Sequence, residues 1–118
     1  MSYVQGFLIP VPKANKQAYI DVAEKSAAIF MEYGALRVVE SWSDSVPDGK
    51  VTDFKRAVKA NDDEAIAFSW IEWPDKETCD DAANKMETDE RWKDMGDMPF
   101  DGKRMIWAGF EPIIDSGA

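Results

Sequence analysis

The feature that most constrains the fold is an order of segments that occurs twice within 118 residues. Each time, a segment rich in β-branched and aromatic residues precedes one with apolar residues at helical spacing, and a second strand-like segment follows. The predicted strands are residues 3–11 (YVQGFLIPV), 35–43 (ALRVVESWS), 65–73 (AIAFSWIEW) and 105–114 (MIWAGFEPII). This repeated strand, helix, strand order predicts an α+β fold.

Local signals set the ends of the two predicted helices. Asn15 is a suitable N-cap for a helix that runs to Tyr33, and Gly34 follows as a residue free to adopt the left-handed conformation that ends helices. Asp75 can cap the second helix. One face of that helix is predicted to be buried and carries Cys79, Ala82, Ala83 and Met86.

The length fits a single domain, residues 1–118, that contains both halves. Two successive βαβ units predict a ferredoxin-like protomer with an antiparallel sheet. Residues 44–64 are harder to place: Pro47-Asp48-Gly49 marks a turn, and residues 54–60 are predicted to form a short strand in an inserted β excursion. A short helical turn around residues 54–58 is the alternative.

Two helices cover only one face of a four-stranded sheet, so the other face needs a different explanation. Alternation along the strands gives a set of mostly small residues, expected under the helices: Val4, Gly6, Leu8, Ala67, Ser69 and Ile71. The opposite set is mostly large: Tyr3, Phe7, Ile9, Ile66, Phe68 and Trp70. Because large apolar residues on an uncovered face need a partner, we predict a homodimer with a core or cavity between two sheets.

Composition excludes several classes of function. The chain has no histidine, which removes Ser-His-Asp and Cys-His catalysis and most catalytic zinc, iron and haem sites. Its net charge of −9 opposes binding to nucleic acid. No apolar run is long enough to cross a membrane and no secretory signal is visible, so we expect a cytoplasmic protein without a membrane span. No metal site or cofactor is predicted.

Three ionisable residues are candidates for chemistry. Glu40 and Glu111 are predicted on the face with the large residues, close to tryptophans, where a carboxylate can have a raised pKa and act as a general base or accept an indole N–H bond. Arg104 either lies near a sheet edge or points into a pocket and binds an anion. The candidate ligand-binding residues are aromatic and are expected to line a pocket between sheet and helices: Phe7, Phe68, Trp70 and Trp107.

Four stretches of the chain resemble a known family. These are YVQGFLIPVP, YGALRVVESWSDSVPDGKVTDF, AFSWIEWPDKE and MPFDGKRMIWAGFEPII, of which the last is the most specific. They are similar to the YbaA-like proteins, a bacterial family with a domain of unknown function in the dimeric α+β barrel superfamily. The resemblance implies a ferredoxin-like protomer that dimerises through its sheets, and it implies no activity or catalytic residues.

These observations lead to two main functional hypotheses, and a dimer with a fully packed face that acts through another protein is a third possibility. The first is a homodimer that binds a small molecule between sheet and helices. The alternative is a cofactor-free oxygenase or isomerase acting on a small aromatic or carbonyl compound, with Glu40 or Glu111 as the base and Arg104 stabilising negative charge.

Overall fold

The computed structural model describes residues 2–117 and contains one four-stranded sheet with helices packed against it. In chain order the elements are β1 (Tyr3–Pro12), η1 (Lys13–Asn15), α1 (Lys16–Glu32), β2 (Arg37–Trp42), α2 (Phe54–Ala57), β3 (Glu64–Trp73), α3 (Lys76–Thr88), α4 (Arg91–Asp94), η2 (Gly102–Arg104) and β4 (Ile106–Phe110). The predicted α+β class is confirmed, and the four strands predicted in the repeated order are present with ends that differ by a few residues.

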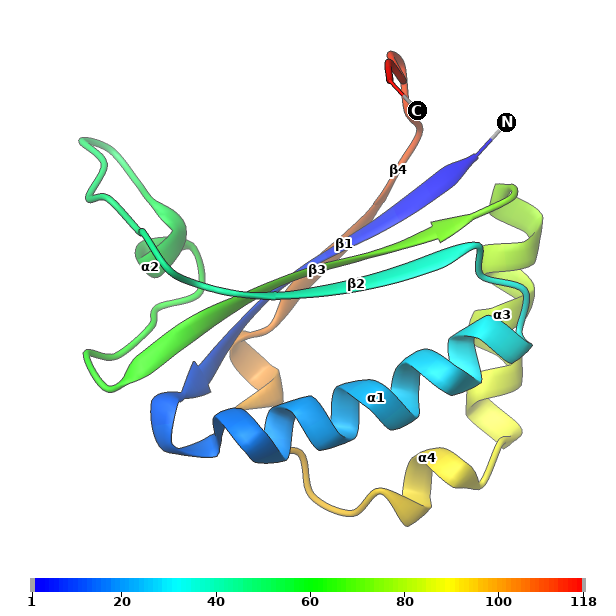
Figure 1. The fold of residues 1–118 in the computed structure, drawn as a ribbon, viewed down its shortest axis with the longest axis horizontal. Helices are drawn as coiled ribbons and strands as arrows, with labels where there is room; N and C mark the ends of the chain where they lie inside the picture. Colours follow the sequence, from blue (N-terminus) through cyan, green and yellow to red (C-terminus); the bar gives the residue numbers. More distant parts are fainter. Residues whose placement is uncertain (1, 118) are drawn as a thin grey trace.

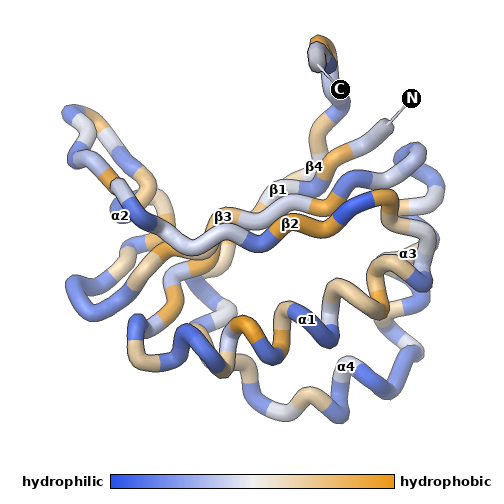
Figure 2. Tube along the Cα trace, viewed as in Figure 1, coloured by the Kyte–Doolittle hydropathy of each residue, from blue (hydrophilic) through white to orange (hydrophobic). Residues whose placement is uncertain are grey.

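The sheet is antiparallel throughout, in the order β2-β3-β1-β4. The helices α1, α3 and α4 lie on one side of it, whereas α2 and the C-terminal end of the chain extend to the other side (Figure 1). We call these the helix face and the open face of the sheet. Hydrophobic and hydrophilic positions alternate along α1, as expected for a helix with one side toward the sheet (Figure 2).

The ends of α1 follow the sequence signals. Gly34 has φ +109° and donates its N–H to the Met31 carbonyl oxygen, while the N–H of Ala35 donates to the Phe30 carbonyl oxygen. This pair of bonds is the Schellman motif, which satisfies carbonyl groups at the end of a helix. Asn15 occupies the predicted N-cap position but forms no capping bond, and its side-chain amide nitrogen donates to the carbonyl oxygen of Pro99.

The helix α3 begins as predicted. Asp75 accepts a hydrogen bond from the Thr78 N–H at 2.7 Å, which satisfies one of the free donors of the first turn. Cys79 and Ala82 are buried on its inner side, so the interpretation of Cys79 as a small buried hydrophobe is confirmed. The short helix α4 has no counterpart in the predicted elements.

The predicted strand at residues 54–60 is wrong, and the alternative helical turn is confirmed as α2. Asp53 caps this helix by accepting from the Arg56 N–H at 2.8 Å. The guanidinium group of Arg56 in turn donates to the carbonyl oxygens of Gly49 and Val51. These local bonds stabilise a compact turn without any partner strand, and β-propensity could not reveal them.

The predicted orientation of β1 is also wrong. Phe7 pairs with Ser69 and Ile9 pairs with Ala67, so both large residues lie on the helix face, where the sequence analysis placed Val4, Gly6 and Leu8. The prediction for β3 holds, because Ala67 and Ser69 face the helices. Register decides this: the small residues of β3 leave room beside them for the large side chains of β1.

The core consists of two buried clusters under opposite ends of α1. At its N-terminal end, Tyr19 packs with residues of the central strands, which are Ile9, Val11 and Ala67. At its C-terminal end, Ile29 and Tyr33 pack with residues of β3 and α3, which are Ile71, Trp73, Cys79 and Ala82. The middle of α1 therefore lies between two ends that are packed against the core.

Candidate functional site

A cavity of about 330 Å³ lies beneath the middle of α1, between the two core clusters. The residues of α1 above it are mostly small, namely Val22, Ala23, Ser26 and Ala27. Large residues at the two ends of α1 hold the helix away from the sheet, and these small side chains cannot fill the space that results. Aromatic residues and methionines complete the lining: Phe7, Phe30, Trp92, Phe100, Met86, Met98 and Met105.

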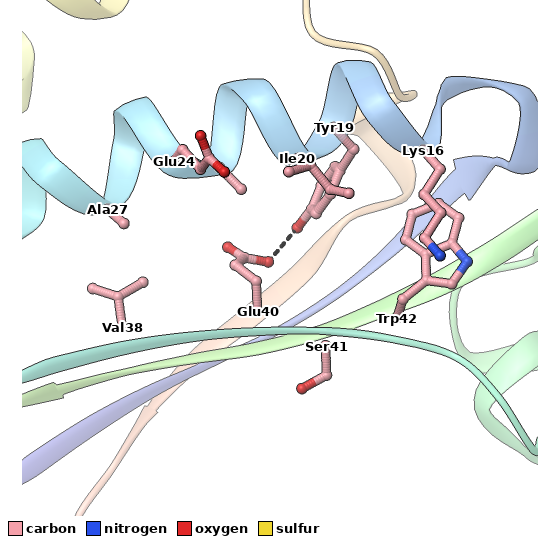
Figure 3. A pocket seen from close by; sticks show the side chains of 10 residues that line it. Lys16, Tyr19, Ile20, Glu24, Ala27, Val38, Glu40, Ser41 and Trp42 are labelled. Atoms are coloured by element: carbon pink, nitrogen blue, oxygen red, sulfur yellow. Dashed lines mark hydrogen bonds between the residues drawn. The ribbon is translucent and has the colours of Figure 1, made fainter.

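One carboxyl group enters this apolar space. Glu40 projects from β2 toward α1, and the Tyr19 hydroxyl donates a hydrogen bond to its Oε1 atom at 2.6 Å (Figure 3). Ser69 is the residue directly opposite Glu40 in the pairing of β2 with β3, and it lines the same cavity. Glu40, Tyr19 and Ser69 thus form a compact polar group in a mainly apolar space, which we call the Glu40 cluster.

The environment changes the acidity of both titratable members. Glu40 belongs to an edge strand and is exposed as a whole residue, but the protein around its inward-pointing carboxyl group reduces the contact of that group with water and raises its pKa. The hydroxyl groups of Tyr19 and Ser69 partly offset this effect, because they stabilise the carboxylate. Burial and the adjacent Glu40 raise the pKa of Tyr19, so Tyr19 remains a neutral hydrogen-bond donor at physiological pH.

Two further spaces adjoin the cavity. The first, of about 340 Å³, opens between α1 and β2 and is bordered by Lys16, Glu24 and Trp42 (Figure 3). Tyr19 and Glu40 line both this opening and the cavity. The second, of about 370 Å³, lies toward α3 and β4 and is lined by residues that include Gln5, Trp73, Cys79 and Trp107.

The structure divides the predicted aromatic pocket in two. Phe7 lines the cavity, and Trp107 pairs with Phe7 in the register of β1 with β4 and borders the adjoining space near α3. Phe68 and Trp70 lie on the open face, where their rings pack against each other at 5.7 Å between centroids. These four residues therefore do not share one pocket within the protomer.

The three ionisable residues predicted as candidates for chemistry also lie apart from one another. Glu40 lies in the site, although on the helix face and not on the face predicted for it. Arg104 forms two hydrogen bonds of 2.7 Å with the carboxylate of Glu64 and another with Asp101, so its guanidinium group holds η2 against the start of β3. Glu111 is exposed beyond the end of β4.

The main residues that sequence reasoning missed are Tyr19 and the small residues of α1. Tyr19 lies on the inner side of α1, but its hydrogen bond with Glu40 depends on the pairing of β2 with β3. The sequence signal for the cavity is the run of small residues at positions 23, 26 and 27 between larger ones. This spacing places small side chains on the inner side of one helix.

Neither a metal centre nor a membrane span is indicated in the described part of the chain. Within residues 2–117, no three carboxylate or cysteine side chains gather in a way that could hold a metal ion. No helix in this range is long and apolar enough to cross a membrane.

Comparison with known proteins identifies relatives over nearly the whole chain. The family model for proteins of unknown function DUF1428 matches residues 2–102. The uncharacterized protein YbaA of Escherichia coli (strain K12) is 58% identical over 116 residues, which cover 98% of this chain and 99% of that protein. The uncharacterized protein YbaA of Shigella flexneri matches to the same extent. The chain therefore belongs to the YbaA-like family of proteins of unknown function, DUF1428.

Proposed function

We propose that this protein is a homodimer that binds a small molecule in the cavity between α1 and the sheet. The observation that supports this most strongly is the Glu40 cluster, which places three polar side chains together in a mainly apolar space of about 330 Å³. Small-molecule sites in proteins commonly combine apolar walls with a few convergent polar groups. A space left only by poor packing would not need an ionisable residue.

The proposed ligand has an apolar body and one polar group. The body would contact the aromatic and methionine side chains, and methionine adapts its shape to irregular ligands. The polar group would contact Glu40 or the hydroxyl of Ser69. The ligand would enter through the opening between α1 and β2, where Lys16 and Trp42 lie (Figure 3).

The proposal includes a ferredoxin-like protomer that pairs with a second copy through its open face, as in a dimeric α+β barrel. The strand order β2-β3-β1-β4 with two βαβ halves supports this topology. Several apolar residues on the open face are about half exposed, namely Phe68 (46%), Ile106 (45%) and Phe110 (57%). Such a group of exposed large side chains is characteristic of a protein interface.

The test of binding is native mass spectrometry of freshly purified protein, followed by a variant that fills the cavity. We expect a dimer that carries additional mass, and we expect this mass to disappear on denaturation. Ala23→Phe places a ring in the cavity and should abolish retention. Ala28→Phe adds the same ring at an exposed position of α1 and should leave retention unchanged. Equal retention by both variants would refute the assignment of the cavity.

The enzymatic alternative receives less support from the geometry. It retains Glu40 as a base, but Arg104 is held by Glu64 and Asp101, and Glu111 lies outside the cavity. No cationic group among the residues lining the cavity is available to stabilise developing negative charge. We therefore propose binding, not catalysis.

A further inference from the structure

The charges of the residues that line the cavity indicate which class of ligand it can bind. Of the described residues that line it, Glu40 is the only one with an ionisable carboxyl group, and none is a lysine or an arginine. A bound anion would therefore place a second negative charge beside Glu40 among mainly apolar side chains. Like charges repel strongly in such surroundings, so the cavity disfavours carboxylates, sulfates and phosphates.

Glu40 lines the cavity without a cationic partner among residues 2–117, unlike three carboxylates that form ion pairs elsewhere in the protein. Glu64 is paired with Arg104, Asp89 with Arg91, and Asp53 with Arg56. Within residues 2–117, no basic side chain forms an ion pair with Glu40, and the neutral hydroxyl of Tyr19 donates a hydrogen bond to it. The carboxyl group thus retains the capacity to accept further hydrogen bonds from a ligand.

The walls of the cavity suit a cation as well. The rings of Phe7, Phe30, Trp92 and Phe100 line the same space as Glu40. The faces of aromatic rings carry negative electrostatic potential and attract ammonium groups, most strongly where water is excluded. A positively charged group would therefore be stabilised both by the carboxylate and by the surrounding rings.

From these three observations we propose that the cavity selects an apolar organic cation, with a primary or secondary ammonium group bonded to Glu40 and an aromatic or alkyl body among the rings. This inference rests on the proposed function, since it specifies the ligand of the same cavity. Besides Glu40, the opening carries one charge of each sign, Lys16 and Glu24, and so does not oppose a cation. The net charge of −9 raises the local concentration of cations around the protein.

The test compares three compounds that share one ring system and differ in charge: 2-naphthylmethylamine, 2-naphthylmethanol and 2-naphthoate. Isothermal titration calorimetry with the full-length protein at pH 8 gives their dissociation constants. We expect the amine to bind roughly tenfold or more tightly than the alcohol, because a charge-assisted hydrogen bond is about twice as strong as a neutral one. The acid should bind most weakly.

A substitution tests whether Glu40 causes the preference for the amine. Glu40→Gln should weaken binding of the amine about tenfold and leave that of the alcohol nearly unchanged. Glu111→Gln removes the same charge at an exposed position outside the cavity and should preserve the preference for the amine. This control separates a local ion pair from the general effect of net charge.

The pH dependence of binding to the wild-type protein provides a second test. Binding of the amine should weaken as the pH falls through the pKa of Glu40, while binding of the alcohol should not change. The titratable groups near Glu40 are Tyr19, Lys16 and Glu24, all from α1. Tyr19 stays neutral because its pKa is raised. Glu24→Gln separates a contribution of that residue: if this variant loses the pH dependence, the assignment to Glu40 is overturned.

The outcomes are distinguishable. A preference for the amine that Glu40→Gln removes supports the inference. Alcohol binding as tight as that of the amine, or tighter binding of the acid, would overturn the selectivity but leave the proposed binding function intact. Failure of all three compounds to bind at millimolar concentration would overturn the inference, whereas the proposed binding function is tested separately by the mass spectrometry of wild type and Ala23→Phe.

Discussion

At the scale of single residues, Glu40 links stability to the proposed function. Its pKa is raised in the folded protein, chiefly because burial disfavours the charged form. A carboxyl group of this kind stabilises the fold when the pH is below its pKa in the unfolded chain. This contribution is lost as the pH rises through its pKa in the folded protein. The empty protein is therefore destabilised at neutral pH by the group proposed to bind the ligand, as is common in functional sites.

The substitution Glu40→Gln should consequently raise the melting temperature at pH 8, because the amide carries no charge and its oxygen still accepts from Tyr19. The difference from the wild type should shrink toward pH 4, where Glu40 becomes neutral. Thermal denaturation followed by circular dichroism between pH 4 and 8 measures this difference. A variant that melts lower than the wild type at pH 8 would contradict the assignment of a raised pKa.

Arg104 has the opposite electrostatic role, because it stabilises the charged form of its partner. Its hydrogen bonds lower the pKa of Glu64, whose side chain is only 4% exposed, and that of Asp101. The two carboxylates bonded to Arg104 therefore stabilise the fold when the pH is above their pKa values in the unfolded chain. This contribution is lost as the pH falls through their pKa values in the folded protein.

We expect Arg104→Met to lower the melting temperature by several degrees at pH 7, since it leaves the buried Glu64 carboxylate without its cation. The deficit should decrease as the pH falls below about 4, where carboxylates become protonated. Lys103→Met removes the neighbouring exposed positive charge and serves as the control. Equal melting temperatures for the two variants would show that the contacts of Arg104 do not stabilise the fold.

At the scale of elements, the end of α1 determines how the chain enters β2. Gly34 adopts φ +109°, and a Cβ atom built there would lie 2.9 Å from Cγ2 of Thr78 in α3. Both backbone conformation and close packing between helices therefore require glycine at this position.

The substitution Gly34→Ala should destabilise the protein by about 1–2 kcal/mol or more, the cost of a left-handed conformation for a residue with a side chain. Urea denaturation at pH 7 measures the change in free energy of unfolding. Gly102→Ala is the matched control, because a Cβ atom there meets nothing within 4 Å and the backbone is not left-handed. A smaller effect at Gly34 than at Gly102 would refute the argument.

At the scale of the whole molecule, the two faces of the sheet differ in their proposed roles. The helix face contains the cavity, and the open face carries half-exposed apolar residues that we propose to bury in a dimer. The helix α2 extends over one end of the open face, where Phe54 packs edge to face against Phe68 at 6.3 Å between ring centroids. An arrangement in which both faces are used explains apolar residues on both sides of each central strand.

A charge on the open face should therefore dissociate the proposed dimer. We expect Phe68→Glu to give a monomer of 13.3 kDa in sedimentation equilibrium, because burying an unpaired carboxylate in an apolar interface is unfavourable. Met31→Glu changes an apolar residue of similar exposure on α1 and should leave the assembly unchanged. A dimer that persists in the Phe68→Glu variant would place its interface elsewhere.

Much of the architecture could be predicted because its signals are local. Gly34 and Asp75 marked helix ends through their own conformational preferences, and the periodicity of residues 3–11 and 65–73 marked strands. The short helix α2 was mispredicted because its stability comes from bonds of Asp53 and Arg56 with a neighbouring turn. Such bonds depend on the path of the loop and not on propensity.

The candidate site was predicted only in part, for a related reason. Glu40, Phe7 and Trp107 were named from the sequence, but their separation from Phe68 and Trp70 depends on which way each strand faces. A shift of one residue in register exchanges the two faces of a strand, and both faces of β1 carry apolar residues. Alternation within β1 therefore could not identify its buried side.

The sequence by itself determined the fold class, the order of the four strands and the two long helices along the chain, and the presence of a single cysteine without histidine. These properties follow from composition and short-range patterns. Only the tertiary structure decided that Tyr19 meets Glu40 and that small residues in the middle of α1 leave a cavity above the sheet. The physical reason is that both features arise between residues distant in sequence, where pairing register and the packing of large side chains set the distances.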